Sequence, residues 1–235
     1  MNSEMVFPLY QKLAEDIKRQ IADGILKENE KLPPELELSK EYSVSRVTVR
    51  KAMEILADGG YVKKHQGIGT FVAARKLNRI HDKGMGFTDL CETEGKTPSA
   101  ELISAEWITA TVPMAQHLGI EEGERVLKIS RIRRIDGVPV MLEVNYFSSQ
   151  YSYLMEQDLT KSLYATLRAH GDMPNHAVKV VEIGYVTPEE AEYLNMSAGG
   201  VTLIMKETVT NDSQEVIHYC KQVVNPERYK LTIRF

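Results

Sequence analysis

The chain has 235 residues, enough for two domains or one large one, and its 43% hydrophobic and 26% charged residues are ordinary for a soluble globular protein. Two distant cysteines, Cys91 and Cys220, exclude a disulfide framework and the close spacing of a zinc or redox motif, so a reducing cytoplasm is expected. No run reaches the roughly 18 apolar residues of a membrane span, and the first ten residues lack the apolar core of a signal peptide.

Charge is distributed unevenly along the chain, whose net charge is −4. Residues 43–76 contain seven basic and two acidic side chains, so the rest of the chain carries −9. Such asymmetry predicts one end that meets phosphate and another that does not.

The first two predicted elements are helices separated by a proline turn. Apolar residues recur at helical spacing over residues 8–24, and Gly24 closes the pattern. Pro33 and Pro34 forbid helix immediately before them, and Pro34 can open the next helix, in which Glu35 lies near the positive end.

A second turn, residues 43–45, leads into a basic helix. Ser45 is a good N-cap for a helix over residues 46–59. Its inward face carries Val49 and Leu56, while Arg46, Thr48 and Arg50 stay outside near the first turn. In helix-turn-helix proteins, such a turn enters the major groove, where the planar fork of arginine matches the O6 and N7 acceptors of guanine.

A glycine-bent hairpin follows the basic helix. Residues 61–65 are predicted to form a strand, Gly67 and Gly69 bend it, and residues 70–72 return. The whole of residues 1–74 is thus predicted to be a winged helix-turn-helix domain. Its expected DNA-binding residues are Glu35, Ser45, Arg46, Thr48, Arg50, Lys63, Lys64, His65, Gly67 and Gly69. The alternative is a solvated basic face on a small helical domain.

Residues 75–90 lack sustained periodicity and are predicted to be a linker. Residues 91–235 then alternate short β-type runs with turns and short helical stretches. Turns such as Asp136-Gly137 indicate hairpins, so the second domain is expected to be α+β with an antiparallel sheet.

Three motifs in the first domain resemble the GntR family of bacterial transcription regulators. They are Leu32-Pro33-Pro34-Glu35, residues 45–52 (SRVTVRKA) and residues 67–72 (GIGTFV). Pro34 stands where the family usually has serine, Leu36 where it has a DNA-contacting arginine, and Ile68 where many members have lysine or arginine. The operator preference of the family is therefore not carried over.

The remainder resembles the HutC-type branch of those regulators, whose second domain has the chorismate-lyase-like (UTRA) fold. The resemblance rests on short motifs at residues 86–89, 94–98, 130–133, 139–143, 162–164 and 227–229. It implies an effector-binding domain over residues 91–235.

Arg131 and Arg133 lie two apart on a predicted strand and therefore share a face. They repel each other unless an anion or a carboxylate lies between them, and a phosphate or carboxylate ligand suits them. Alternatively, Arg131 pairs with a structural acid and Glu143 with Arg133, and no ligand binds.

In phosphosugar-binding members of the family, the matching arginine positions hold phosphate, and the position of Glu143 holds sugar hydroxyls. The resemblance implies effector-binding roles for Gly86, Phe87, Arg131, Arg133, Glu143, Ser162, Tyr164 and His218. His218 stands where some phosphosugar binders have glutamate, which leaves room for an amino acid, a fatty or urocanate-like acid, or another phosphate ester.

The sequence predicts a cytoplasmic transcription regulator, a repressor that binds double-stranded operator DNA as a homodimer under control of a small anionic effector, a phosphosugar or a carboxylate. No cofactor or metal is expected, because His176 and His218 are isolated. The sequence leaves two alternatives. An enzyme is disfavoured because no paired base and nucleophile stands out, and a ligand-free architectural DNA binder does not explain the large acidic second domain.

Overall fold

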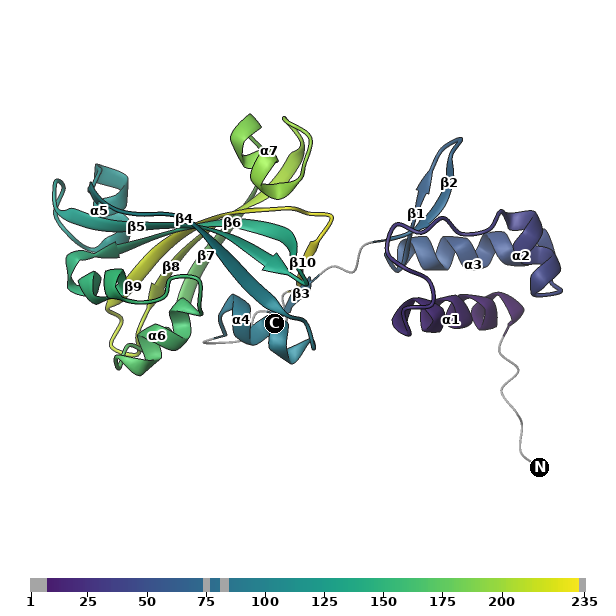
Figure 1. Ribbon diagram of the computed structural model, residues 1–235, viewed down its shortest axis with the longest axis horizontal. Helices are drawn as coiled ribbons and strands as arrows, with labels where there is room; N and C mark the ends of the chain where they lie inside the picture. The colour runs from purple at the N-terminus through teal and green to yellow at the C-terminus, as the bar shows by residue number, and fades with distance from the viewer. Residues whose placement is uncertain (1–7, 74–76, 81–84, 233–235) are drawn as a thin grey trace, which may run out of the picture. The chain divides into compact units, whose positions relative to one another are not determined.

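The chain separates into two units, residues 1–75 and residues 76–235, in a computed structural model that describes residues 8–73, 77–80 and 85–232 (Figure 1). None of the helices within these ranges is long and apolar enough to cross a membrane.

The first unit is a three-helix domain with a hairpin. It comprises α1 (Leu9–Ala22), α2 (Glu35–Glu41), α3 (Arg46–Asp58), β1 (Val62–His65) and β2 (Gly69–Val72). The inward faces of the helices bury Leu13, Ile17, Val49 and Leu56 in one apolar core. The predicted winged helix-turn-helix fold is confirmed.

The turn between α2 and α3 fixes how the third helix begins. Ser43 has a φ of +52°, which reverses the chain, and Ser45 then caps α3 by accepting a hydrogen bond of 3.1 Å from the Thr48 amide. The Tyr42 hydroxyl donates to Asp16 of α1 at 2.8 Å, so α2 is anchored next to α3. The first turn of α3 is left facing outward.

The second unit is built on one six-stranded antiparallel sheet, as the sequence predicted. Its strands follow the order β4 (Pro98–Thr109), β5 (Arg125–Ile135), β6 (Val138–Ser148), β9 (Val216–Val224), β8 (Val201–Thr210) and β7 (His176–Tyr185). Strands β4 and β7 are therefore its two edges.

Helices cover both faces of this sheet (Figure 1). On one face lie α4 (Phe87–Thr93), α6 (Leu163–Ala169) and the 3-10 segment η1 (Ser149–Glu156), which packs with α6 over Leu127 and Phe147. On the other face lie α5 (Val112–Leu118) and α7 (Pro188–Leu194), each over its own apolar cluster.

The linker predicted for residues 75–90 is wrong in part. β3 (Leu77–Ile80) pairs in parallel with β10 (Tyr229–Thr232), and α4 already begins at Phe87. The partner of β3 lies about 150 residues later in the chain, so local periodicity does not reveal it. Residues 75–76 and 81–84 of that prediction lie outside the described residues.

Candidate functional site

All eight positions that the sequence proposed for the effector line one pocket, on the sheet face that α4 and α6 cover. They are Gly86, Phe87, Arg131, Arg133, Glu143, Ser162, Tyr164 and His218. The sheet supplies the floor, and the starts of the two helices supply the rim.

Strand register explains why these side chains meet. Arg131 of β5 lies opposite Glu143 of β6, which lies opposite Gln222 of β9. The adjacent row on the same face brings Asn145, Cys220 and Glu207 together. Residues two apart on a strand share a face, so these two rows form the centre of the pocket floor, with Arg133 in the row on one side and His218 in the row on the other.

The guanidinium of Arg131 is bound by the protein itself. Its side chain is buried, with 1% of the residue exposed. Nε and Nη2 donate to Glu143 Oε1, and Nη1 donates to the backbone oxygens of Leu159 at 3.0 Å and Lys161 at 2.9 Å. Glu143 thus supplies the carboxylate that two neighbouring arginines require.

Arg133 is held less completely. Its Nη1 lies 3.7 Å from Glu143 Oε1, its Nη2 donates to Thr88 Oγ1 at 3.1 Å, and its guanidinium carbon lies 4.5 Å from the centre of the Phe87 ring. Burial lowers the pKa of Arg133 to about 10, although Glu143 opposes that shift, so the side chain remains charged at neutral pH.

The pocket carries one uncompensated positive charge. Burial would raise the pKa of Glu143, but the charges of Arg131 and Arg133 outweigh it and hold that pKa at about 2. One carboxylate therefore faces two guanidiniums. The other acid in the floor, Glu207, is neutralised by Lys179 of β7, whose Nζ lies 2.9 Å from its Oε2.

His218 is an uncharged member of the floor. Burial lowers its pKa to about 4, and its ring stacks on Phe147 at 5.1 Å between centres. Within the described part of the chain, Arg133 Nε, both ring nitrogens of His218 and Gln222 Oε1 make no hydrogen bond. Because buried polar atoms are nearly always bonded, this arrangement fits a polar guest.

The rim closes tightly over the floor. A Cβ at Gly86 would lie 3.1 Å from the Tyr164 ring, so a larger residue there requires the ring to shift by a few tenths of an ångström. Asp89 of α4 pairs with Arg168 of α6 at 2.8 Å. Ser162 caps α6 by accepting from the Ala165 amide at 3.2 Å, and its hydroxyl proton is not used in that bond. The free volume of about 30 Å³ holds roughly two water molecules, so a larger guest requires the rim to move.

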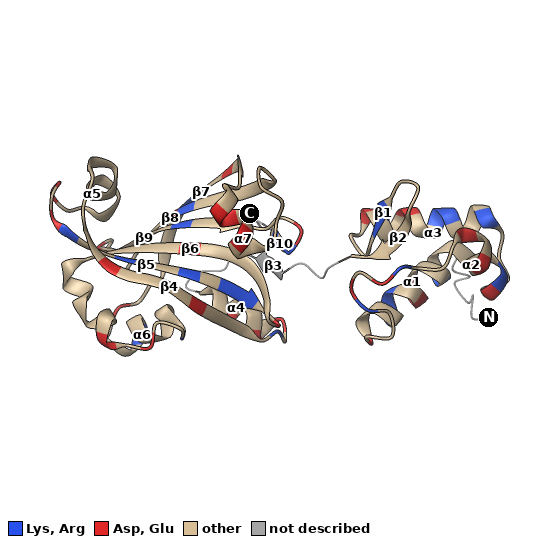
Figure 2. Ribbon diagram, turned by 45° about the horizontal axis from the view of Figure 1, so that its top comes forward, with Lys and Arg blue, Asp and Glu red and all other residues tan. Residues whose placement is uncertain are grey.

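The expected DNA-binding residues of α3 lie on one exposed end of the first unit. Arg46 and Arg50 are exposed, and Arg50 Nη2 lies 3.4 Å from Glu35 Oε2, which orients it. The Thr48 hydroxyl lies 2.8 Å from Ser45 Oγ. Figure 2 shows basic residues on both α3 and β1 of this unit.

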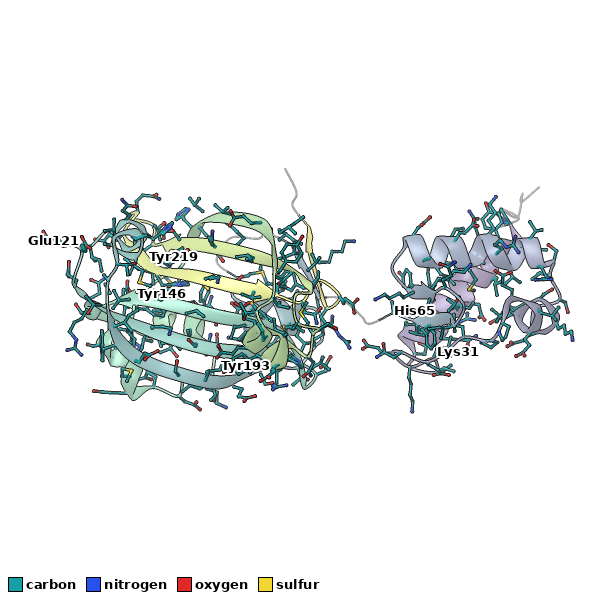
Figure 3. All side chains as sticks on the ribbon, turned by 90° about the horizontal axis from the view of Figure 1, so that it is seen from above. Lys31, His65, Glu121, Tyr146, Tyr193 and Tyr219 are labelled. Carbon is teal, nitrogen blue, oxygen red and sulfur yellow. The ribbon has the colours of Figure 1, made fainter. Side chains whose placement is uncertain are left out.

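The remaining expected DNA-binding residues include those on the hairpin of β1 and β2. Lys63, Lys64 and His65 are exposed on β1, and the His65 ring lies 5.4 Å from the Phe71 ring on β2. Gly69 has a φ of +141°, a conformation that other residues rarely adopt, so the backbone of the hairpin favours glycine there, next to Lys31 (Figure 3 labels Lys31 and His65).

Sequence reasoning missed several candidate residues. Asn145, Glu207 and Gln222 line the pocket, and the period-two step from Glu143 to Asn145 and from His218 to Gln222 would have found two of them. Val47 of α3 was also missed, because an apolar residue in a helix usually packs in the core. It lies between Arg46 and Thr48 and is 75% exposed.

Comparisons with known proteins agree with both units. The model of the UTRA domain matches residues 93–230, and the model of the bacterial regulatory proteins, gntR family, matches residues 9–72. The HTH-type transcriptional repressor NagR of Bacillus subtilis (strain 168) is 28% identical, with 97% of this chain and 95% of that protein covered.

Two further matches concern function and structure. A probable fructoselysine utilization operon transcriptional repressor of Shigella flexneri is 26% identical, with 96% of this chain and 93% of that protein covered. The crystal structure of PhnF from Mycobacterium smegmatis matches with a TM-score of 0.78 and 26% identity, with 95% of this chain and 98% of that chain covered.

Proposed function

The chain belongs to the gntR family of bacterial regulatory proteins and carries a UTRA domain, and from this premise we propose that a small anion in its pocket controls operator binding. Its relatives are transcriptional repressors and regulators, so the chain is a DNA-binding transcription regulator and not an enzyme. We place its action in the cytoplasm, where operator DNA is found.

The uncompensated charge at Arg133 is the observation that best supports an anionic effector. Arg131 and Glu143 neutralise each other, which leaves Arg133 as the cation with a free donor, Nε, beside the pocket. A phosphate or carboxylate there would gain charge-assisted hydrogen bonds in a site already shielded from water. Ser162 supplies a hydroxyl donor on the rim.

The uncharged polar groups favour a sugar derivative as the remainder of that anion. His218 and Gln222 offer donors and acceptors without charge, which match hydroxyl groups, and Glu143 accepts hydrogen bonds. The fructoselysine repressor matches this chain over nearly its whole length, and its name refers to a sugar-derived compound. We therefore propose a phosphosugar first and a small carboxylate second.

On the DNA side, we propose that α3 enters the major groove by its first turn. Arg46 and Arg50 would read base edges, and Ser45 and Thr48 would contact phosphate. Lys63, Lys64 and His65 on the wing would meet the adjacent backbone or minor groove, which the Gly67 and Gly69 turn allows the chain to approach.

We propose that the regulator acts as a homodimer. One small module makes few phosphate contacts and binds weakly, whereas two modules match half-sites about one helical turn apart. An effector that favours one dimer geometry would then change the fit to both half-sites at once.

Calorimetric titration of the full chain tests the effector class. Hexose 6-phosphates, the matching free hexoses, hexonates and inorganic phosphate would be compared. We expect a hexose 6-phosphate to bind and Arg133→Gln to weaken that binding at least tenfold. Arg134→Gln, at a half-buried neighbour paired with Glu101, should leave it unchanged. If only a hexonate binds, the effector is a carboxylate and not a phosphosugar. If Arg133→Gln binds the hexose 6-phosphate as tightly as the wild type does, Arg133 is not part of the site.

A further inference from the structure

The outward face of α3 carries one apolar side chain among charged ones. Val47 is 75% exposed, and it lies about 200° around the helix from Val49, which is fully buried. Its exposed neighbours on the outward face are Arg46, Arg50 and Glu54. The side chain of Val47 therefore points away from the core of the first unit, into the surface that these charged residues surround.

Two polar side chains beside Val47 are engaged in contacts within the unit. The hydroxyl of Thr48 lies 2.8 Å from Ser45 Oγ, the oxygen that caps the helix. Lys51, one turn after Val47, extends over the Tyr10 ring, with Nζ 4.3 Å from the ring centre. These contacts leave the methyl groups of the valine uncovered at the front of the first turn.

A valine at this position gains nothing from the fold of the unit. A β-branched side chain loses rotamer freedom in a helix, so valine is a weaker helix former than alanine or arginine. Burial usually compensates for that cost, but Val47 is exposed. A contact with another molecule would supply the missing burial.

The major groove of DNA presents one methyl group, which belongs to thymine, and its other distinguishing groups are hydrogen-bond donors and acceptors. Valine can bond to none of these polar groups, and a base edge that it covered would lose its water without gaining a partner. We propose that Val47 recognises a thymine by packing against its methyl group. The inference rests on the entry of α3 into the major groove, which belongs to the proposed function, and adds the base that is read.

The position of Val47 also places this thymine near the bases that the arginines read. Arg46 and Arg50 are about 6 Å apart along the helix axis, which corresponds to roughly two base pairs. Val47 lies between them in the same turn. Each half-site is therefore expected to contain a thymine within about two base pairs of a guanine that an arginine recognises.

Deoxyuridine, which lacks only the methyl group of thymine, tests this contact. The probe is an operator selected from genomic DNA by its binding to the full chain, and its thymines are replaced by deoxyuridine one at a time. Fluorescence anisotropy then compares the wild type with Val47→Ala. At one thymine of a half-site, replacement should weaken wild-type binding about threefold to fivefold, the effect of burying one methyl group, and should not weaken Val47→Ala.

Two further variants serve as controls. Val112→Ala removes the same methyl groups from an exposed position on α5 of the second unit and should keep the wild-type response to deoxyuridine. Arg50→Ala should bind every operator more weakly, because its own contact is lost, and should still respond to deoxyuridine at the same thymine.

A second measurement does not depend on the natural operator. Selection by the wild type from DNA with randomised half-sites should enrich one thymine next to the guanines. With Val47→Ala, the preference for that thymine should disappear, whereas the guanines should remain enriched.

The outcomes separate this inference from the proposed function. If deoxyuridine weakens wild-type binding at no thymine, or weakens Val47→Ala equally at every thymine, only the role of Val47 is overturned. If Arg50→Ala binds the operator as tightly as the wild type does, the entry of α3 into the groove is overturned as well.

Discussion

Within the pocket, Arg131 donates to Glu143 and to two backbone carbonyls, whereas Arg133 keeps Nε without a hydrogen bond in the described chain. Two arginines on one face of a strand therefore have different surroundings. Truncating Arg131 leaves a buried carboxylate and two carbonyls without their donor, so its first effect falls on stability.

Arg131→Met is expected to destabilise the second unit by about 3 kcal/mol, because the buried Glu143 loses its hydrogen bonds from Arg131 and keeps only the longer ion pair with Arg133. Urea unfolding followed by the fluorescence of Trp107, the only tryptophan, reports on this unit. A single variant as stable as the wild type would show that the ion pair is not structural.

His218 predicts how stability depends on pH. Its pKa falls from an ordinary 6.5 to about 4 on folding, so the unfolded chain binds more protons between these values. Stability is complete above pH 6.5 and declines as the pH falls toward 4, by about 2 kcal/mol at pH 5 from this group. Comparing wild type and His218→Gln at pH 7.5 and 5.0 isolates this loss, and an equal decline in both proteins would contradict it.

At the residue scale, the sequence predicted which positions meet but not how they pair. The motifs placed Arg131, Arg133 and Glu143 correctly at one pocket. The choice of Arg131 as the partner of Glu143 depends on the carbonyls of Leu159 and Lys161, about 30 residues later, which no local pattern encodes.

At the scale of elements, α3 carries the DNA-reading prediction. Arg50→Ala should weaken operator binding about tenfold or more, because a base or phosphate contact is lost, and should leave effector affinity unchanged. Fluorescence anisotropy with labelled operator measures the first and calorimetry the second. Arg19→Ala on α1, also exposed and paired with an acid, is the control. A loss of both affinities would indicate misfolding, and no loss would remove Arg50 from the interface.

Elements with local signals were predicted well. The cap at Ser45 is recognised from the residues of a single turn, and α3 begins where it was expected. β3 was missed because its partner, β10, lies at the other end of the unit.

At the scale of the whole molecule, regulation requires that effector binding in the pocket change the affinity for the operator. Occupied and empty dimers must differ in operator affinity, and a hundredfold difference corresponds to about 2.7 kcal/mol. From the charge distribution and the motifs, the sequence predicted one unit that binds DNA and another that binds an effector. The pocket's resident salt bridge and its closed rim arise from tertiary packing and were not predicted.

The most direct measurement is the fluorescence anisotropy of a labelled operator bound to the protein. The operator is first selected from genomic DNA by its binding to the protein, and the hexose 6-phosphate that binds best is then titrated in. The wild type should leave the operator at hexose 6-phosphate concentrations at which Arg133→Gln remains bound to it. The free hexose should release neither protein. Equal release of both proteins would contradict the role of Arg133. An operator affinity that does not change when calorimetry shows an anion to be bound would contradict control by the pocket.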